Sequence, residues 1–107
     1  MSARSGVSKL CTLPALAARI PDGASIIFGG VFLHRAPFAL VRELVRQRRR
    51  NLEVIKPSPA YDLDLLCRAK AVAKVRAGIV AMEANFGLAP WFRSAVERNE
   101  VRLEEHA

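Results

Sequence analysis

Short apolar runs alternate along this chain with segments in which apolar side chains recur every three or four residues. The runs are typical of buried strands, and the recurring spacing is typical of amphipathic helices. The pattern predicts strands at residues 25–28, 52–56, 75–82 and 101–105, and helices at residues 13–20, 37–47, 61–69 and 90–99. Because strands that alternate with helices form right-handed βαβ units, we expect an α/β fold with a parallel sheet of about four strands.

Capping and breaker residues agree with this assignment. Thr12 can cap the first helix, and Pro21 ends it. Pro37 and Pro90 suit the first turns of the second and fourth helices, where a missing N–H costs nothing. We expect residues 1–9 to be a flexible tail and residues 10–107 to form one domain.

The apolar runs also predict how deeply each strand is buried. The runs at residues 25–28 and 75–82 are almost continuous, as in strands that are covered on both faces of a parallel sheet. Glu53 and Lys56 interrupt the run at residues 52–56. We therefore expect that strand to be wetter than the other two.

The most informative stretch is residues 22–37, which read as a turn, a strand, a glycine pair and a helix start. Gly29 and Gly30 follow the strand directly, and without Cβ atoms they can take positive φ and let a ligand approach closely. Open α/β sheets bind ligands beyond the carboxyl ends of their strands, where helix N-termini begin. The pattern predicts a binding site here.

This stretch resembles the first signature of family I CoA-transferases, in their A-type subunit. That signature is Asp-Gly, two variable residues, three apolar residues, Gly-Gly-Phe, three variable residues, Gly, any residue and Pro. The positions that match are Asp22, Gly23, Ile26, Ile27, Phe28, Gly29, Gly30 and Pro37. Val31 replaces the Phe and Arg35 replaces the second Gly, and an Arg near this position is similar to the glutaconate CoA-transferase branch and its ring-opening hydrolase relatives.

Two later stretches extend the resemblance, which covers residues 10–105. Residues 64–66 are similar to the family's Asp-Leu-Leu, and residues 86–90 to its Phe-Gly-Leu-Ala-Pro loop. Family subunits are more than twice as long, so the resemblance implies the N-terminal half of a three-layer α/β/α fold. It also implies a central first strand, with strands two and three on one side of it and strand four on the other.

The resemblance implies a supporting role in catalysis. In the family, a glutamate of the B-type subunit attacks the acyl-CoA and forms a covalent thioester intermediate. That motif has no counterpart here. This chain would line the acyl pocket and offer backbone N–H groups to the developing oxyanion. Coenzyme A enters as a substrate, the other substrate is a carboxylic acid, and the partner is a B-type subunit.

The candidate site residues follow strands or, for Glu105, end one. The residues expected to line the substrate and CoA pocket are Gly29, Gly30, Val31, His34, Arg35 and Glu83. Arg35 can bind a carboxylate through two parallel hydrogen bonds. Glu105 matches, weakly, the position of an acid/base glutamate in the hydrolase branch; its alternative is a solvated residue near the chain end. His34 has no neighbouring His, Cys or acidic cluster, so no metal role is expected.

Composition narrows the classes of function. The 107 residues carry a net charge of +7, part of it at Arg46, Arg48, Arg49 and Arg50, which suit either a solvated helix end or a phosphate-rich partner. No aromatic residues interleave with this basic cluster, which argues against nucleic-acid binding. No apolar run reaches the roughly 20 residues of a membrane span, and no signal peptide is evident, so a cytoplasmic protein is expected.

Three hypotheses follow. The chain is an A-type transferase subunit, a subunit of a ring-opening acyl-CoA hydrolase, or a catalytically inactive fragment that acts as a binding module. A binder driven by charge alone is a further alternative. Because the strand at residues 101–105 would end the sheet with unpaired backbone groups, we expect the isolated chain to be a dimer or larger, or to aggregate.

Overall fold

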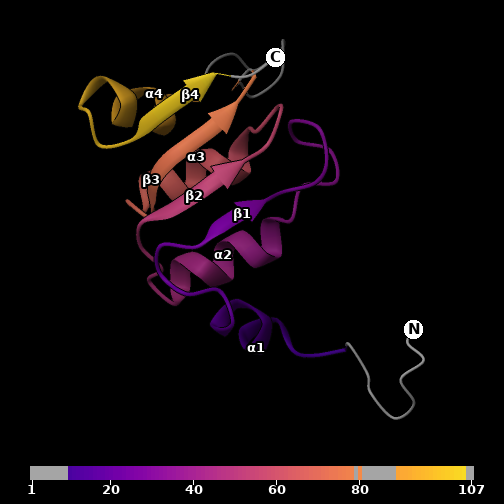
Figure 1. The fold of residues 1–107 in the computed structure, drawn as a ribbon. Helices are drawn as coiled ribbons and strands as arrows, with labels where there is room; N and C mark the ends of the chain where they lie inside the picture. Colours follow the sequence, from indigo (N-terminus) through magenta and orange to yellow (C-terminus); the bar gives the residue numbers. More distant parts are fainter. Residues whose placement is uncertain (1–9, 79, 81–88, 106–107) are drawn as a thin grey trace.

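The computed structural model describes residues 10–78, 80 and 89–105. Within these residues helices and strands alternate, as the sequence predicts (Figure 1). The elements are α1 (Leu13–Ala18), β1 (Ser25–Ile27), α2 (Phe38–Arg46), β2 (Leu52–Ile55), α3 (Tyr61–Arg68), β3 (Val72–Ala77), α4 (Pro90–Glu97) and β4 (Arg102–Glu105). The predicted cap of α1 is confirmed, since the Thr12 hydroxyl accepts the Ala15 N–H at 3.2 Å. None of the described helices is long and apolar enough to cross a membrane.

All three strand pairings in the described sheet are parallel, and the strand order is β1-β2-β3-β4. The α/β class and the four-stranded parallel sheet are therefore confirmed. The expected place of β4 beside β1 is wrong, because β4 pairs with β3 and β1 lies at an edge. Each crossover moves one strand further in the same direction, so the chain winds across the sheet without reversing.

Figure 1 shows α2, α3 and α4 on the same face of the sheet. Crossovers of one hand that advance in one direction leave their helices on one face. The helices also pack on each other in sequence, α1 on α2, α2 on α3 and α3 on α4. The second helical layer of the predicted three-layer arrangement is not among the residues that the structure describes.

The core lies between the sheet and this helical layer. Leu52 and Val54 of β2 and Val75 of β3 are fully buried and meet Leu44 of α2 and Leu66 of α3. Burying a side chain of this size stabilises a fold by about 1.5–3 kcal/mol relative to leaving it exposed. This shared core fixes the relative positions of β1, β2 and β3, and therefore of the loops that follow them.

The face of the sheet away from the helices carries charges. Lys74 Nζ lies 2.7 Å from Glu104 Oε2 and 3.7 Å from Glu53 Oε2, and Arg76 Nε lies 2.9 Å from Glu53 Oε2. These four side chains, which we call the charge ladder, join β2, β3 and β4. Alternation of apolar and charged positions is typical of a sheet with one solvated face.

The predicted burial is wrong for β1, β2 and β3. Strand β3 is not covered on both faces, because Lys74 and Arg76 lie partly exposed on the face away from the described helices. Ile27 of β1 is 75% exposed, because β1 is an edge strand and the described helices leave its outer face uncovered. Strand β2 is more buried than β1, since it is central and the side chains of Leu52 and Val54 are inaccessible, as is that of Lys56 directly after the strand. The apolar run of β1 shows that its side chains are hydrophobic, but it does not show whether the strand lies at the centre or at the edge of the sheet.

Both edges of the described sheet are open, because β1 pairs only with β2 and β4 only with β3. Unpaired edges can pair with another chain. We predict that the purified chain sediments as a dimer or larger at micromolar concentration. A monodisperse monomer with cooperative melting would contradict this prediction.

Asp64 of α3 ties two distant stretches of the sequence together. Its Oδ1 accepts the Phe92 N–H at 2.8 Å, so the carboxylate receives an unpaired amide from the first turn of α4. Burial is the larger influence and raises the pKa of Asp64, although the hydrogen bonds from Phe92 and Trp91 oppose it. Asp64, the first residue of the stretch that is similar to the family's Asp-Leu-Leu, thus helps to fix the start of α4.

The raised pKa of Asp64 predicts a pH effect. A carboxyl group whose pKa is higher in the folded than in the unfolded chain stabilises the fold fully below the unfolded value of about 3.9, and this contribution is lost as pH rises through the folded pKa. We therefore expect Asp64→Asn to gain stability relative to the wild type between about pH 3.5 and pH 7. Urea unfolding of the wild type and the variant across this pH range measures the difference in their free energies of unfolding. A relative stability that is constant, or moves against Asn, would contradict the sign.

Candidate functional site

The segment between β1 and α2 forms a closed turn at the carboxyl edge of the sheet. Phe28, directly after β1, still donates its N–H to Ile55 O at 3.2 Å. The chain then turns back, and Val31 and His34 exchange two hydrogen bonds: Val31 N–H to His34 O at 3.0 Å and His34 N–H to Val31 O at 2.8 Å. We call residues 29–35 the glycine turn.

The two glycines of this turn have different roles. Gly30 has φ +90°, and a Cβ there would lie 2.5 Å from His34 O and 2.7 Å from Arg35 O. No atom lies within 4 Å of the position that a Cβ of Gly29 would occupy. Position 30 therefore requires glycine for steric reasons, whereas position 29 has room for a larger side chain.

Arg35 also has a left-handed backbone, with φ +58°. This conformation favours glycine, which explains why the family signature has glycine at the corresponding position. Phe32 in the same turn has φ +48°. Non-glycine residues in this region cost about 1–3 kcal/mol each, and such strain clusters at functional sites.

The glycine turn borders an open cavity of about 570 Å³, lined by Gly30, Val31, His34 and Arg35. The structure thus brings together four of the predicted site residues. Val31 is 57% exposed, and His34 and Arg35 are also exposed. Among the described residues, the N–H groups of Gly29 and Gly30 have no hydrogen-bond acceptor. The cavity is therefore lined by a cationic side chain and by Gly30, whose N–H has no acceptor within the part of the chain that the structure describes.

A second loop supports the glycine turn. Ser58, in the Pro57-Ser58-Pro59 segment after β2, accepts the Phe32 N–H through its carbonyl oxygen at 2.8 Å. Below this loop, Lys56 Nζ lies 2.7 Å from Asp62 Oδ2, and both side chains are fully buried. Sequence reasoning treated this segment only as a breaker. The available signal was a lysine directly after a buried apolar run, with an aspartate six positions later.

Of the two predicted glutamates, only Glu105 lies among the described residues, and it is far from the glycine turn. Glu105 ends β4, three strands away from β1, which corresponds to roughly 14 Å across the sheet. It lines a different cavity of about 240 Å³ with Ala77, Gly78 and Leu103 among others. Glu83 lies outside the described residues. Both roles remain predictions.

The basic cluster lies at the opposite end of the sheet from the cavity. Arg46 ends α2, and residues 48–50 lead into β2, so all four arginines lie near the amino ends of the strands. Arg46 forms an ion pair with Glu43, and the Arg50 N–H bonds Asp22 Oδ1 at 2.8 Å. A ligand in the cavity would have to extend along the whole length of α2 to reach the cluster.

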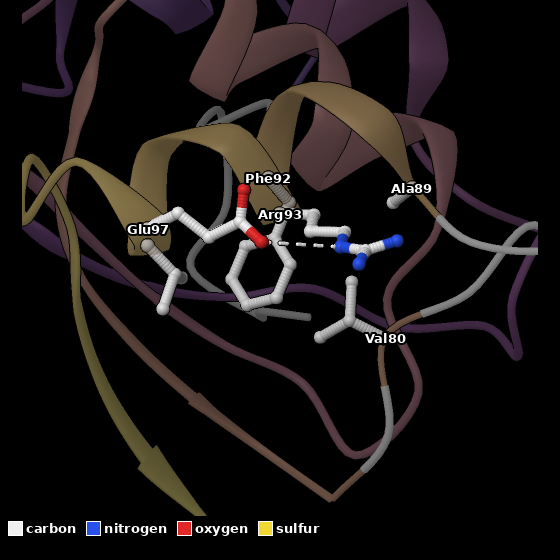
Figure 2. A pocket seen from close by; sticks show the side chains of 6 residues that line it. Val80, Ala89, Phe92, Arg93 and Glu97 are labelled. Atoms are coloured by element: carbon white, nitrogen blue, oxygen red, sulfur yellow. Dashed lines mark hydrogen bonds and ion pairs between the residues drawn. The ribbon is translucent and has the colours of Figure 1, made fainter.

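An apolar groove of about 270 Å³ runs along α4 (Figure 2). Val80, Phe92 and Val96 line it, and Arg93 Nε lies 3.4 Å from Glu97 Oε2 beside it. Trp91, predicted to face inward, is 49% exposed and lies under the Arg68 guanidinium at 5.4 Å from its ring centroid. The tryptophan begins α4 at the surface, where a cation–π contact replaces core packing.

The two cysteines lie in different environments. Cys11 is exposed and Cys67 is buried, and neither forms a disulfide. Burial, with smaller contributions from Asp64 and Glu100, raises the pKa of the Cys67 thiol to about 12. A thiol with this pKa carries almost no thiolate at neutral pH, so Cys67 is a core residue and not a nucleophile.

Residues 12–106 match the family model described as Coenzyme A transferase. The chain is 33% identical over 97 residues to the cholesterol ring-cleaving hydrolase IpdA subunit of Rhodococcus jostii (strain RHA1), a match that covers 91% of this chain and 32% of that protein. It is therefore about a third of the length of this relative, less than the half that the sequence predicts.

Two solved structures share the fold. A variant of the decarboxylase AibA/AibB superposes with a TM-score of 0.83 at 33% identity, over 91% of this chain and 38% of that chain. Glutaconate coenzyme A-transferase from Acidaminococcus fermentans superposes with a TM-score of 0.87 at 26% identity, over 94% of this chain and 32% of that chain. The family model covers nearly all of this sequence and the fold agrees with it, so this chain belongs to the Coenzyme A transferase family.

Proposed function

We propose that this chain is the A-type portion of an enzyme that transfers coenzyme A between an acyl-CoA and a carboxylic acid. A B-type partner subunit supplies the nucleophilic glutamate. The observation that carries the proposal is the cavity at the carboxyl end of β1. There Arg35 lies in the same turn as backbone N–H groups that have no acceptor among the described residues. The two-part name of the similar AibA/AibB decarboxylase also supports a partner subunit.

In this proposal the glycine turn stabilises charge. The N–H groups of Gly29 and Gly30 are available to the oxygen that becomes negative when the thioester carbonyl is attacked. Donors fixed in place before the reaction stabilise such an oxyanion without reorganisation, and the loss of one typically costs a factor of about 10² to 10³ in kcat. The two hydrogen bonds between Val31 and His34 hold the turn in the required shape.

Arg35 binds the carboxylate of the acid substrate. Its side chain is exposed at the cavity, and no ion pair of Arg35 occurs among the described residues. A guanidinium group can hold a carboxylate through two parallel hydrogen bonds, which orients the acid as well as attracting it.

Arg35→Gly tests this role, because the left-handed backbone at this position accepts glycine without strain. We expect the variant to fold as stably as the wild type, while its KM for a dicarboxylate rises at least about tenfold, as for a lost charged hydrogen bond. The assay is CoA transfer from an acyl-CoA by the complex with a B-type subunit.

Arg48→Gly is the matched control. Arg48 is also exposed with φ +60°, but it lies at the opposite end of the sheet. Equal effects of the two substitutions on KM would show that net charge, and not a carboxylate site, is responsible. No transfer by the wild type in any pairing would overturn the transferase proposal and favour an inactive binding module.

Ring-opening hydrolysis is a second candidate, favoured by the 33% identity to the IpdA subunit. The two reactions differ in their need for an acceptor. A hydrolase adds the elements of water to its CoA ester without any added acid, whereas a transferase is inactive until a carboxylic acid is present. Mass spectrometry of the CoA esters after incubation with and without a dicarboxylate separates them.

A further inference from the structure

We propose that Lys56 and Asp62 are positioning residues for the glycine turn. Their buried ion pair fixes residues 57–60, which we call the support loop, and the support loop holds the turn that lines the cavity. The effect on catalysis rests on the proposed function, whereas the effect on the turn itself does not. No substrate contact is assigned to either residue.

The pair links the end of β2 to the start of α3. Lys56 follows β2 directly, and its Nζ lies 2.7 Å from Asp62 Oδ2 with both side chains fully buried. The other carboxylate oxygen, Asp62 Oδ1, accepts the N–H groups of Ala60 and Leu63, each at 2.9 Å. One carboxylate therefore holds the lysine, the last residue of the support loop and the first turn of α3.

The support loop in turn contacts both neighbouring segments at the carboxyl edge of the sheet. Ser58 O accepts the Phe32 N–H of the glycine turn at 2.8 Å. Pro57 O accepts the Gly78 N–H, just after β3, at 2.9 Å. A displacement of the support loop would therefore move the glycine turn and the segment after β3 together.

Stability alone is a poor reason for this pair. Taking two charges out of water costs free energy that their attraction often fails to recover, and apolar residues of similar size are often as stable or more so. An ion pair with two further hydrogen bonds does, however, define one geometry, whereas apolar side chains allow several. At a catalytic site, a misplacement of about 1 Å can cost about a hundredfold in rate.

The test is the double variant Lys56→Met with Asp62→Asn. Methionine keeps the volume of the lysine stem, and the Asn Oδ1 can still accept the two amides, so we expect the double variant to fold with a modest loss of stability from the buried Asn Nδ2 group. Hydrogen exchange then reports on the turn. We expect the Phe32 amide to exchange at least about tenfold faster than in the wild type. The Leu52 amide, bonded to Ala71 O at 2.9 Å in the sheet, is expected to keep its protection.

Activity gives the second measurement. In the complex with a B-type subunit, we expect kcat/KM to fall about tenfold to a hundredfold while the melting temperature changes little. Unchanged protection of Phe32 in the folded double variant would overturn the positioning role. An inactive wild-type complex would overturn the proposed function and leave the exchange result standing by itself.

If the double variant fails to fold, native-state hydrogen exchange of the wild type tests the proposal instead. If the pair organises the support loop, the amides of Phe32, Ala60 and Leu63 lose protection in one cooperative opening, with the same dependence on denaturant. Opening of Phe32 independently of Ala60 and Leu63 would contradict the proposal.

Discussion

Replacing Gly30 by alanine is expected to destroy the glycine turn and the cavity beside it. The new Cβ would lie 2.5 Å from His34 O and 2.7 Å from Arg35 O, and the contacted atoms belong to the backbone and cannot rotate away. The φ of +90° adds strain for any residue with a Cβ. Together these effects should destabilise the chain by about 2–4 kcal/mol, measured by urea unfolding.

Gly29→Ala is the control for this substitution. It is the adjacent glycine, and no atom lies within 4 Å of its added Cβ. We expect its effect on stability to stay within about 0.5–1 kcal/mol, as for an unconstrained loop position. If Gly29→Ala keeps its stability but loses CoA transfer, close approach of substrate to this residue is the direct explanation. Equal stability of both variants would contradict the geometry described for Gly30.

Removing the carboxylate of Asp62 is expected to have the other large effect. Asp62→Ala leaves the fully buried Lys56 ammonium without its partner and two amide N–H groups without their acceptor. Breaking a buried ion pair from one side typically costs about 3–5 kcal/mol, because an uncompensated charge remains in the core. For a domain whose total stability is about 5–15 kcal/mol, this is a large fraction.

Glu53→Ala provides the comparison for Asp62→Ala. Glu53 also pairs with cations, Lys74 and Arg76, but on the partly solvated face of the sheet. Removing it should cost no more than about 1 kcal/mol, because water can solvate the remaining cations. Thermal or urea unfolding of both variants gives the difference directly. A loss from Asp62→Ala as small as that from Glu53→Ala would show that the buried lysine readily finds another partner or water.

The sequence predicted the elements and the site-bearing turn because both depend on local patterns. Alternating apolar periods gave the order of strands and helices, and the run from Asp22 to Pro37 placed a glycine turn before α2. The third strand was predicted too late, at residues 75–82, because Lys74 interrupts the apolar pattern, whereas β3 spans Val72–Ala77. Strand order was not accessible in this way, since nothing in residues 101–105 records which sheet edge receives them. Burial of β1 was misjudged for the same reason, because Ile27 is as apolar at an open edge as it would be inside.

The geometry of the candidate site was predicted only in part. Val31, His34 and Arg35 were identified because they are contiguous with the glycine pair, and they do line one cavity. The unequal roles of Gly29 and Gly30 depend on the carbonyls of His34 and Arg35, which only the folded turn brings near. Lys56 was predicted to be solvent-exposed, because the sequence pattern of its own strand does not show that its partner Asp62 lies in the next element.

The charge ladder has a consequence for any layer of protein that covers the outer face of the sheet. Glu53, Lys74, Arg76 and Glu104 alternate in sign across three strands, so a covering surface must match that order or retain water over it. Association on this face would then weaken as ionic strength rises, since mobile ions screen partly exposed charges. Pairing at the open strand edges depends on backbone hydrogen bonds and would be far less sensitive to salt. Sedimentation at low and high ionic strength would therefore reveal which surface of the sheet joins this chain to its neighbours.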